Sequence, residues 1–132
     1  MSRFFIALAA VAGVLAAPLP ASAKSAIEGR WKNGKMEIQI APCGRTLCGT
    51  VVKASAKQQS KAQRGSGTDL IGARLITNIR PNGPQIYRAN VYLADRDVNT
   101  SGTIRQVNSN RLNVRGCLWG IICKSTNWDR IG

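Results

Sequence analysis

The chain has 132 residues, of which 19 are lysine or arginine and 6 are aspartate or glutamate, so its formal net charge is +13. This length allows a leader and one small domain and is too short for two domains. Histidine is absent, which excludes Ser–His and Cys–His nucleophiles, and the positive charge favours anionic partners such as lipid head groups or acidic polysaccharides.

Residues 1–23 have the pattern of a secretory signal peptide. Arg3 supplies the positive charge, Phe4 to Ala17 form an apolar run, and Ala21-Ser22-Ala23 fits the small-residue cleavage site. The apolar run is shorter than the roughly 20 residues that span a bilayer. We therefore expect cleavage, a periplasmic or secreted product that does not span the membrane, and a single domain over residues 24–132.

The four cysteines form two close pairs, Cys43 with Cys48 and Cys117 with Cys123. Four cysteines allow three connectivities, but pairing of near neighbours needs no specific long-range approach of the chain, and export provides an oxidising compartment. We therefore expect the disulfides Cys43–Cys48 and Cys117–Cys123. Zinc is the weaker alternative, because these spacings exceed those of most zinc sites and no histidine is available.

Short strands dominate the rest of the chain. Apolar and polar residues alternate over residues 36–40, which is the pattern of a half-buried strand, and residues 47–52 form its return strand. Further strands are expected over residues 69–76, 86–93, 103–107, 111–115, 118–123 and 125–128, with a polar loop over residues 94–102. Many short strands with regular turns predict an all-β fold, an antiparallel sandwich or barrel.

Residues 86–93 show the clearest alternation. One face of this strand carries Tyr87, Val91 and Leu93, which we expect to point to the interior and to contact any ligand. Tyr92 falls on the opposite face.

Residues 53–68 are polar and basic and lack apolar periodicity, so we expect a flexible, solvated loop. A helix is the alternative, and Gly65 would suit its C-terminal end. The basic residues of that helix would form one cationic stripe, a candidate anion-binding surface, at Lys53, Lys57, Lys61 and Arg64.

No catalytic constellation is visible. The carboxylates are scattered, and only Asp95 and Asp97 are close together. They resemble the start of a calcium loop, but Thr100 stands where that loop needs glycine and Gln106 where it needs glutamate. We therefore expect no enzymatic activity, no metal and no cofactor. Export and the scarcity of aromatic residues also argue against a nucleic-acid partner.

The tryptophans suggest two different roles. Trp31 begins the first strand, and Arg130 lies at the end of the last one. Because the first and last strands of a closed barrel are neighbours, Arg130 can stack on Trp31 and close one end. Trp119 lies between the second pair of cysteines and is a candidate for contact with a ligand or partner.

Motifs near both ends of the domain share one order and spacing. The first group is Gly29-Arg30-Trp31, the alternating strand over residues 36–40, and Cys43-Gly44-Arg45-Thr46-Leu47-Cys48-Gly49. The second group is Leu112-Asn113-Val114-Arg115-Gly116-Cys117, Cys123-Lys124-Ser125 and Trp128-Asp129-Arg130. Together they resemble the small exported bacterial proteins of domain-of-unknown-function family 2147, over nearly the whole domain.

The middle of the chain departs from that family. An Asp-, Asn- and Pro-rich segment of the family is replaced by the basic residues 53–68, and a Trp-x-Gly-Gly stretch is reduced to residues 80–84. The resemblance implies a lipocalin-like (calycin) β-barrel of about eight strands, with no established activity. It also implies that Gly29, Trp31 and Arg130 close the barrel as they do in lipocalins.

These observations favour a non-enzymatic binding module that holds a small apolar or amphipathic ligand in the cell envelope. A filled barrel that docks to anionic lipid or polysaccharide through its basic surface is the alternative. A cavity of several hundred Å³ would favour the first reading.

Overall fold

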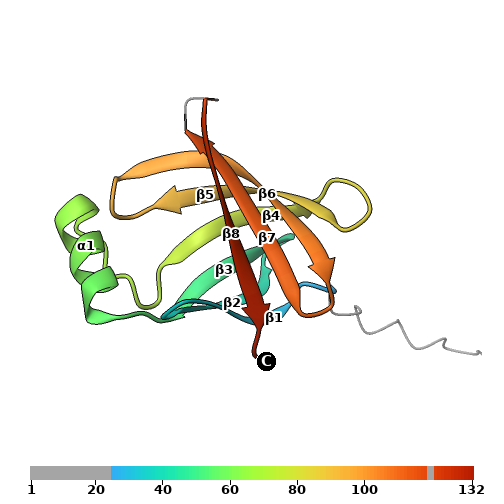
Figure 1. Ribbon diagram of the computed structural model, residues 1–132, viewed down its shortest axis with the longest axis horizontal. Helices are drawn as coiled ribbons and strands as arrows, with labels where there is room; N and C mark the ends of the chain where they lie inside the picture. The colour runs from blue at the N-terminus through green and yellow to red at the C-terminus, as the bar shows by residue number, and fades with distance from the viewer. Residues whose placement is uncertain (1–24, 119–120) are drawn as a thin grey trace, which may run out of the picture.

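The computed structural model describes residues 25–118 and 121–132, so the expected leader lies outside the described residues. Eight strands form a closed barrel in which each strand pairs antiparallel with the next and β8 returns to β1 (Figure 1). The strands are β1 (Gly29–Asn33), β2 (Met36–Cys43), β3 (Thr46–Lys53), β4 (Arg74–Pro81), β5 (Ile86–Leu93), β6 (Val98–Asn108), β7 (Arg111–Leu118) and β8 (Ile122–Arg130). The expected antiparallel β-barrel is therefore confirmed. No helix among the described residues is long and apolar enough to cross a membrane.

Alternation along the strands builds the interior. Ile38 and Ile40 of β2 and Ile104 of β6 are almost fully buried, while their neighbours along each strand are half-buried or exposed. Several expected boundaries were wrong. The strand expected over residues 118–123 does not exist as one element, because β7 ends at Leu118 and β8 begins at Ile122. Strand β6 begins at Val98 within the predicted polar loop, because polar residues suit the solvated outer face of a barrel. Strand β4 begins only at Arg74, five residues after the expected start.

The prediction of a loop over residues 53–68 was wrong, because this segment contains the helix α1 (Ala56–Ser66). Ser55 caps its N-terminus by a capping box: the Ser55 hydroxyl accepts from the backbone N–H of Gln58, and the Gln58 side chain accepts from that of Ser55. Gly67, with φ of 70°, ends the helix in the left-handed conformation, whereas Gly65 lies inside it. Only Ala62 is buried, so the helix shows almost no apolar periodicity.

The turns of the barrel lie alternately at its two ends, because successive strands are antiparallel. One end, the α1 end, carries α1 between β3 and β4, together with the turns β5–β6 and β7–β8 (Figure 1). The other end, the closed end, carries the turns β2–β3, β4–β5 and β6–β7 and the C-terminus.

Both expected disulfides are present. Cys43–Cys48 closes the β2–β3 turn at the closed end, with 5.8 Å between the Cα atoms. Cys117–Cys123 joins β7 to β8 at the α1 end, where the two residues are direct partners in the ladder. Each bridge therefore fixes one corner of the barrel, at opposite ends.

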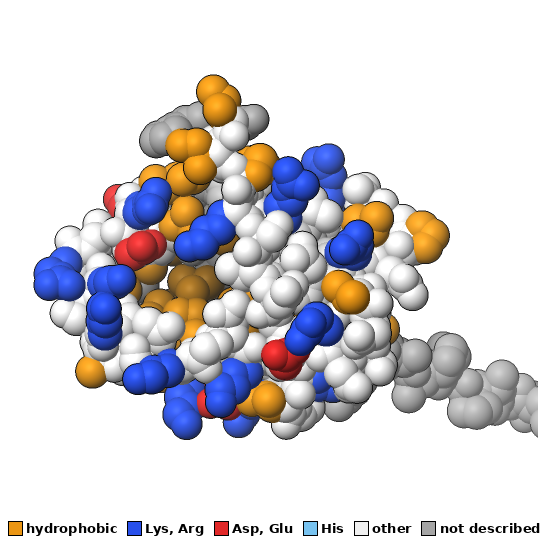
Figure 2. Space-filling model, in the orientation of Figure 1, with side chains coloured by type: hydrophobic (Ala, Val, Ile, Leu, Met, Phe, Trp, Pro, Cys, Tyr) orange, Lys and Arg blue, Asp and Glu red, His pale blue; other side chains and the backbone are white. Residues whose placement is uncertain are grey.

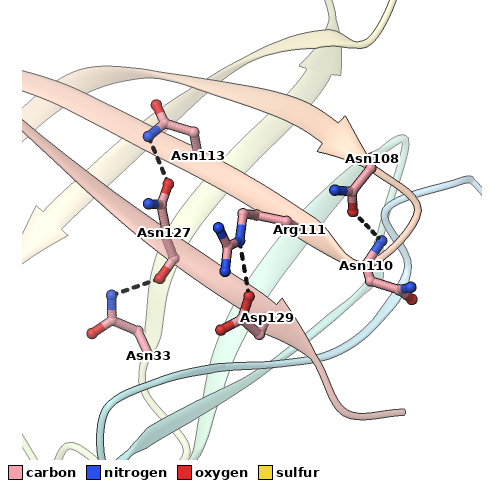
Figure 3. Close-up of polar contacts among 7 residues, drawn as sticks. All are labelled: Asn33, Asn108, Asn110, Arg111, Asn113, Asn127 and Asp129. Atoms are coloured by element: carbon pink, nitrogen blue, oxygen red, sulfur yellow. Dashed lines mark hydrogen bonds and ion pairs between the residues drawn. The ribbon is translucent and has the colours of Figure 1, made fainter.

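The seam between β1 and β8 is short, since only Trp31 and Lys32 have ladder partners on β8. Side chains extend it (Figure 3). The amide of Asn33 donates to the backbone carbonyl of Asn127 at 2.8 Å, and Asn113 donates to the Asn127 side chain at 3.0 Å. Of these two contacts, only the one between Asn33 and Asn127 crosses the seam, whereas Asn113 links β7 to β8. Backbone hydrogen bonds of Arg30 with Ile131 and Gly132 continue the pairing toward the C-terminus.

Candidate functional site

At the closed end, Arg130 lies over the ring of Trp31, with the guanidinium carbon 4.3 Å from the ring centroid. Trp31 is fully buried, and its indole N–H donates to the carbonyl of Ile27 at 2.9 Å. The two residues are also direct ladder partners across the β1–β8 seam. The stacking expected between the first and last strands is therefore present.

The guanidinium of Arg130 on β8 also forms hydrogen bonds with two other segments, the β6–β7 turn and the residues before β1. Its Nε donates to the carbonyl of Ser109 in the β6–β7 turn at 2.8 Å. Its Nη1 and Nη2 donate to the carbonyls of Glu28 and Ala26, at 3.0 and 2.6 Å. Gly29 makes this possible, because a Cβ at that position would lie 2.6 Å from Arg130 Nη1. These contacts of Arg130 therefore fill the part of the closed end that lies around Trp31.

The α1 end holds a pocket of about 390 Å³. Its lining includes buried Ile38, Ile76 and Trp128, and Figure 2 shows the hollow between α1 and β8 with hydrophobic side chains on its floor. The remaining apolar lining comes from β2, the α1–β4 connection, β4, β5, β7, α1 and the β5–β6 turn, through Met36, Leu70, Leu75, Val91, Leu93, Val114, Ala62 and Ala94. A mostly apolar pocket of this size can enclose a small ligand.

Charged side chains meet at the mouth of this pocket. Lys61 of α1 and Lys124 of β8 line it from opposite elements, and Asp95 of the β5–β6 turn lines it as well. Both lysines are exposed, so each can keep its charge in water while its methylene chain borders the apolar interior. The site is thus apolar inside and net positive at its rim.

The residues predicted to face a ligand separate into three groups. Val91 and Leu93 line the pocket at the α1 end. Tyr87 lies on the same strand but borders a different pocket at the closed end, of about 350 Å³, beside Glu28 and Ile79. Trp119 lies outside the described residues.

Tyr92 was expected on the outer face but also lines the pocket. It lies near the end of β5, where the strand approaches its turn, and its hydroxyl donates to Asp97 at 2.6 Å. The ladder alternation is therefore a poor guide to side-chain direction at this point.

The four residues of the predicted cationic stripe are not equivalent. Lys53 ends β3 and lies 3.6 Å from a carboxylate oxygen of Glu37. Lys57, Lys61 and Arg64 follow one side of α1 and are exposed. Lys61 alone of the four lines the pocket.

Sequence reasoning missed Lys124 as a site residue. The register pairs Lys124 with Gly116, and Thr126 and Trp128 follow on the same inward side of β8. The alternation of Lys124, Thr126 and Trp128 could have revealed this orientation, but residues 125–128 were treated as a separate strand. Among the described residues, no group of three or more His, Cys, Asp or Glu side chains is placed to hold a metal ion.

Comparisons with known proteins agree with this architecture. Residues 29–130 match the family described as "Uncharacterized protein conserved in bacteria (DUF2147)". Among solved structures, the chain is similar to protein HP1028 from Helicobacter pylori, described as belonging to the lipocalin family, with a TM-score of 0.58 and 14% identity over 80% of this chain and 82% of that one. At this identity the likeness shows a shared fold. No curated protein matches the chain.

Proposed function

This chain belongs to the DUF2147 family of uncharacterized bacterial proteins, and we propose that it is a non-enzymatic binding protein for a small amphipathic ligand in the cell envelope. The pocket of about 390 Å³ at the α1 end carries this proposal. Its lining is mostly apolar and leads from buried Trp128 to the exposed Lys124. Such a pocket favours a ligand with an apolar body.

The charged side chains at the rim indicate which class of ligand the pocket favours. Lys61 and Lys124 oppose a single carboxylate, Asp95, so an anionic head group at the mouth would gain more attraction than repulsion. A ligand with one carboxylate, sulfonate or phosphate and an apolar tail matches this distribution. Neutral apolar molecules of the same size would bind more weakly.

Two measurements test the pocket. Native mass spectrometry of the protein from its own host should show a co-purifying amphipathic molecule. In vitro, 1-anilinonaphthalene-8-sulfonate serves as an anionic apolar probe. Leu75→Trp adds bulk inside the pocket and should weaken probe binding by about ten-fold or more, because the cavity volume is lost.

Ile71→Trp is the matched control. Ile71 is 46% exposed and lies outside the pocket lining, so the same bulk there should change probe affinity by no more than about two-fold. Equal affinity of the Leu75→Trp protein and the wild type would rule out this pocket as the binding site.

A second candidate function is docking to an anionic lipid or polysaccharide through the basic surface. The excess of 19 basic over 6 acidic residues favours it. Among the described residues, only two ion pairs neutralise part of that charge, Lys53–Glu37 and Arg111–Asp129. Binding that vanishes at high salt is its expected signature, because salt screens exposed charges.

A further inference from the structure

A cationic groove lies on the outer surface of the barrel, away from the apolar pocket. It encloses about 640 Å³ over strands β5 to β8, and three arginines border it: Arg88, Arg105 and Arg115. The rest of its lining is Ser101, Gly102, Thr103, Asn113, Cys117 and Ser125. No acidic and no large apolar side chain is among these residues.

The strand register explains why the arginines converge. Arg88, Thr103, Arg115 and Ser125 are consecutive ladder partners on β5, β6, β7 and β8. Neighbouring strands are about 4.8 Å apart, which places the Cα atoms of Arg88 and Arg115 roughly 10 Å apart, with Thr103 between them. Arg105 lies two residues further along β6, on the same outer face.

The three guanidinium groups are not neutralised within the described part of the chain. None of them forms an ion pair there, and no side-chain hydrogen bond of theirs is present either. Three like charges around one concave surface repel each other and raise the local positive potential. An anion in the groove would relieve that repulsion, and the planar guanidinium fork suits carboxylate, sulfate and phosphate oxygens.

We propose that this groove, the arginine groove, binds an anionic glycan through Arg88, Arg105 and Arg115. The hydroxyl groups of Ser101, Thr103 and Ser125 supply donors and acceptors for sugar hydroxyls. A membrane surface fits less well, because the groove presents no large apolar side chain that could enter the acyl region. The proposal rests on the second candidate function, contact with an anionic envelope component, and is independent of the apolar pocket.

A row of amides extends the groove. Asn113 lines the groove and is joined through Asn127 to Asn33 on β1 (Figure 3). Amide side chains have two donors and one acceptor group and can bond neutral sugar hydroxyls. A glycan chain could therefore continue from the arginines across β7 and β8, with charged groups at one part and neutral sugar units at the other.

The test compares two variants with the same change in charge. The groove variant is Arg88→Gln/Arg105→Gln/Arg115→Gln, and the control is Lys35→Gln/Arg74→Gln/Arg96→Gln. All six residues are exposed, so both proteins should fold, as circular dichroism can check. Binding of a heparin hexasaccharide is measured by titration calorimetry, with dextran as the neutral glycan and phosphatidylglycerol vesicles as the anionic lipid surface.

The wild type should bind the hexasaccharide more tightly than dextran. The groove variant should lose about ten-fold or more of that affinity, whereas the control should lose no more than about three-fold, since long-range charge alone is screened by salt. Equal losses of hexasaccharide affinity in both variants would show that the arginine groove is not the binding site and that general charge attraction accounts for the binding. If the wild type bound the vesicles but not the hexasaccharide, the proposal of a glycan partner would be wrong and an anionic lipid would be the partner. Failure to bind either would overturn the docking function itself.

Discussion

Gly65 of α1 packs directly on the backbone of Asp95 in the β5–β6 turn. A Cβ at position 65 would overlap the Asp95 carbonyl and lie 2.7 Å from its Cα atom. In the next residue, the Ser66 hydroxyl donates to the carbonyl of Ala94 at 2.6 Å. The helix that covers the α1 end is thus fixed to the far side of the pocket mouth by two successive residues.

The close approach predicts that Gly65→Ala destabilises the protein. In most exposed helices this change adds about 1 kcal/mol of stability, because alanine is the better helix former. Here the added methyl meets backbone, which cannot rotate away, so α1 must shift. Urea unfolding should show a lower free energy of unfolding, and 1-anilinonaphthalene-8-sulfonate should bind more weakly.

Ser60→Ala on the same helix is the control, since Ser60 is exposed and its change only improves helix propensity. It should leave stability unchanged or slightly higher. A stabilising effect of Gly65→Ala would contradict the contact between α1 and the β5–β6 turn.

Arg130→Lys should lower the free energy of unfolding by roughly 2 kcal/mol or more, although the charge is kept. A lysine ammonium cannot both stack flat on Trp31 and reach the carbonyls of Ala26, Glu28 and Ser109. Arg111→Lys is the control, because Arg111 makes only an exposed ion pair with Asp129 at 3.0 Å. That change should cost about 1 kcal/mol or less. Similar losses in both variants would argue against a special role for Arg130.

Each disulfide should contribute about 2 kcal/mol, as the loop-entropy model predicts for such short loops. The sequence separations are only 5 and 6 residues. The double variants Cys43→Ser/Cys48→Ser and Cys117→Ser/Cys123→Ser should therefore unfold at lower urea concentrations but remain folded in buffer. Non-reducing peptide mapping should recover the two local pairs. Peptides linked across the pairs would show a different connectivity.

The cationic rim should select for anionic ligands. Lys61→Gln/Lys124→Gln should weaken binding of laurate by about ten-fold and leave dodecanol within about two-fold, because only the carboxylate loses its counter-charges. Arg45→Gln, exposed in the β2–β3 turn at the closed end, should affect neither ligand. Displacement of a fluorescent probe measures both affinities. Equal weakening of both ligands would indicate that the lysines act through the shape of the pocket instead.

The all-β class could be predicted because most strands carry a local signal, and the resemblance to the family favoured a barrel over a sandwich. Alternation over residues 36–40 and over most of 86–93 indicates which side chains enter the interior, with Tyr92 as the exception, and such local patterns need no knowledge of distant segments. The same holds for the two disulfides, whose partners are near neighbours. Contact between Trp31 and Arg130 followed from closure alone, since the first and last strands of a closed barrel must meet.

The helix was missed although one local signal was present. Ser55 and Gln58 have the spacing of a capping box, and Gly67 stands where a helix can end. Apolar periodicity was absent because α1 buries only Ala62 and is fixed by backbone contacts with Asp95 and Ala94. Those contacts join residues about 30 positions apart, so they cannot be predicted from a short segment of the sequence.

Most strands, both disulfide-linked corners and the Trp31–Arg130 contact could be predicted from the chain alone, because they depend on neighbouring residues or on closure of the sheet. The place where a ligand can enter depends on packing between distant segments. Lys61 and Lys124 come together at one mouth, and Arg88 and Arg115 at one groove, through strand register and the docking of α1. Such pairs are set by packing across the whole barrel, and a shift of one residue in register would turn each side chain to the opposite face.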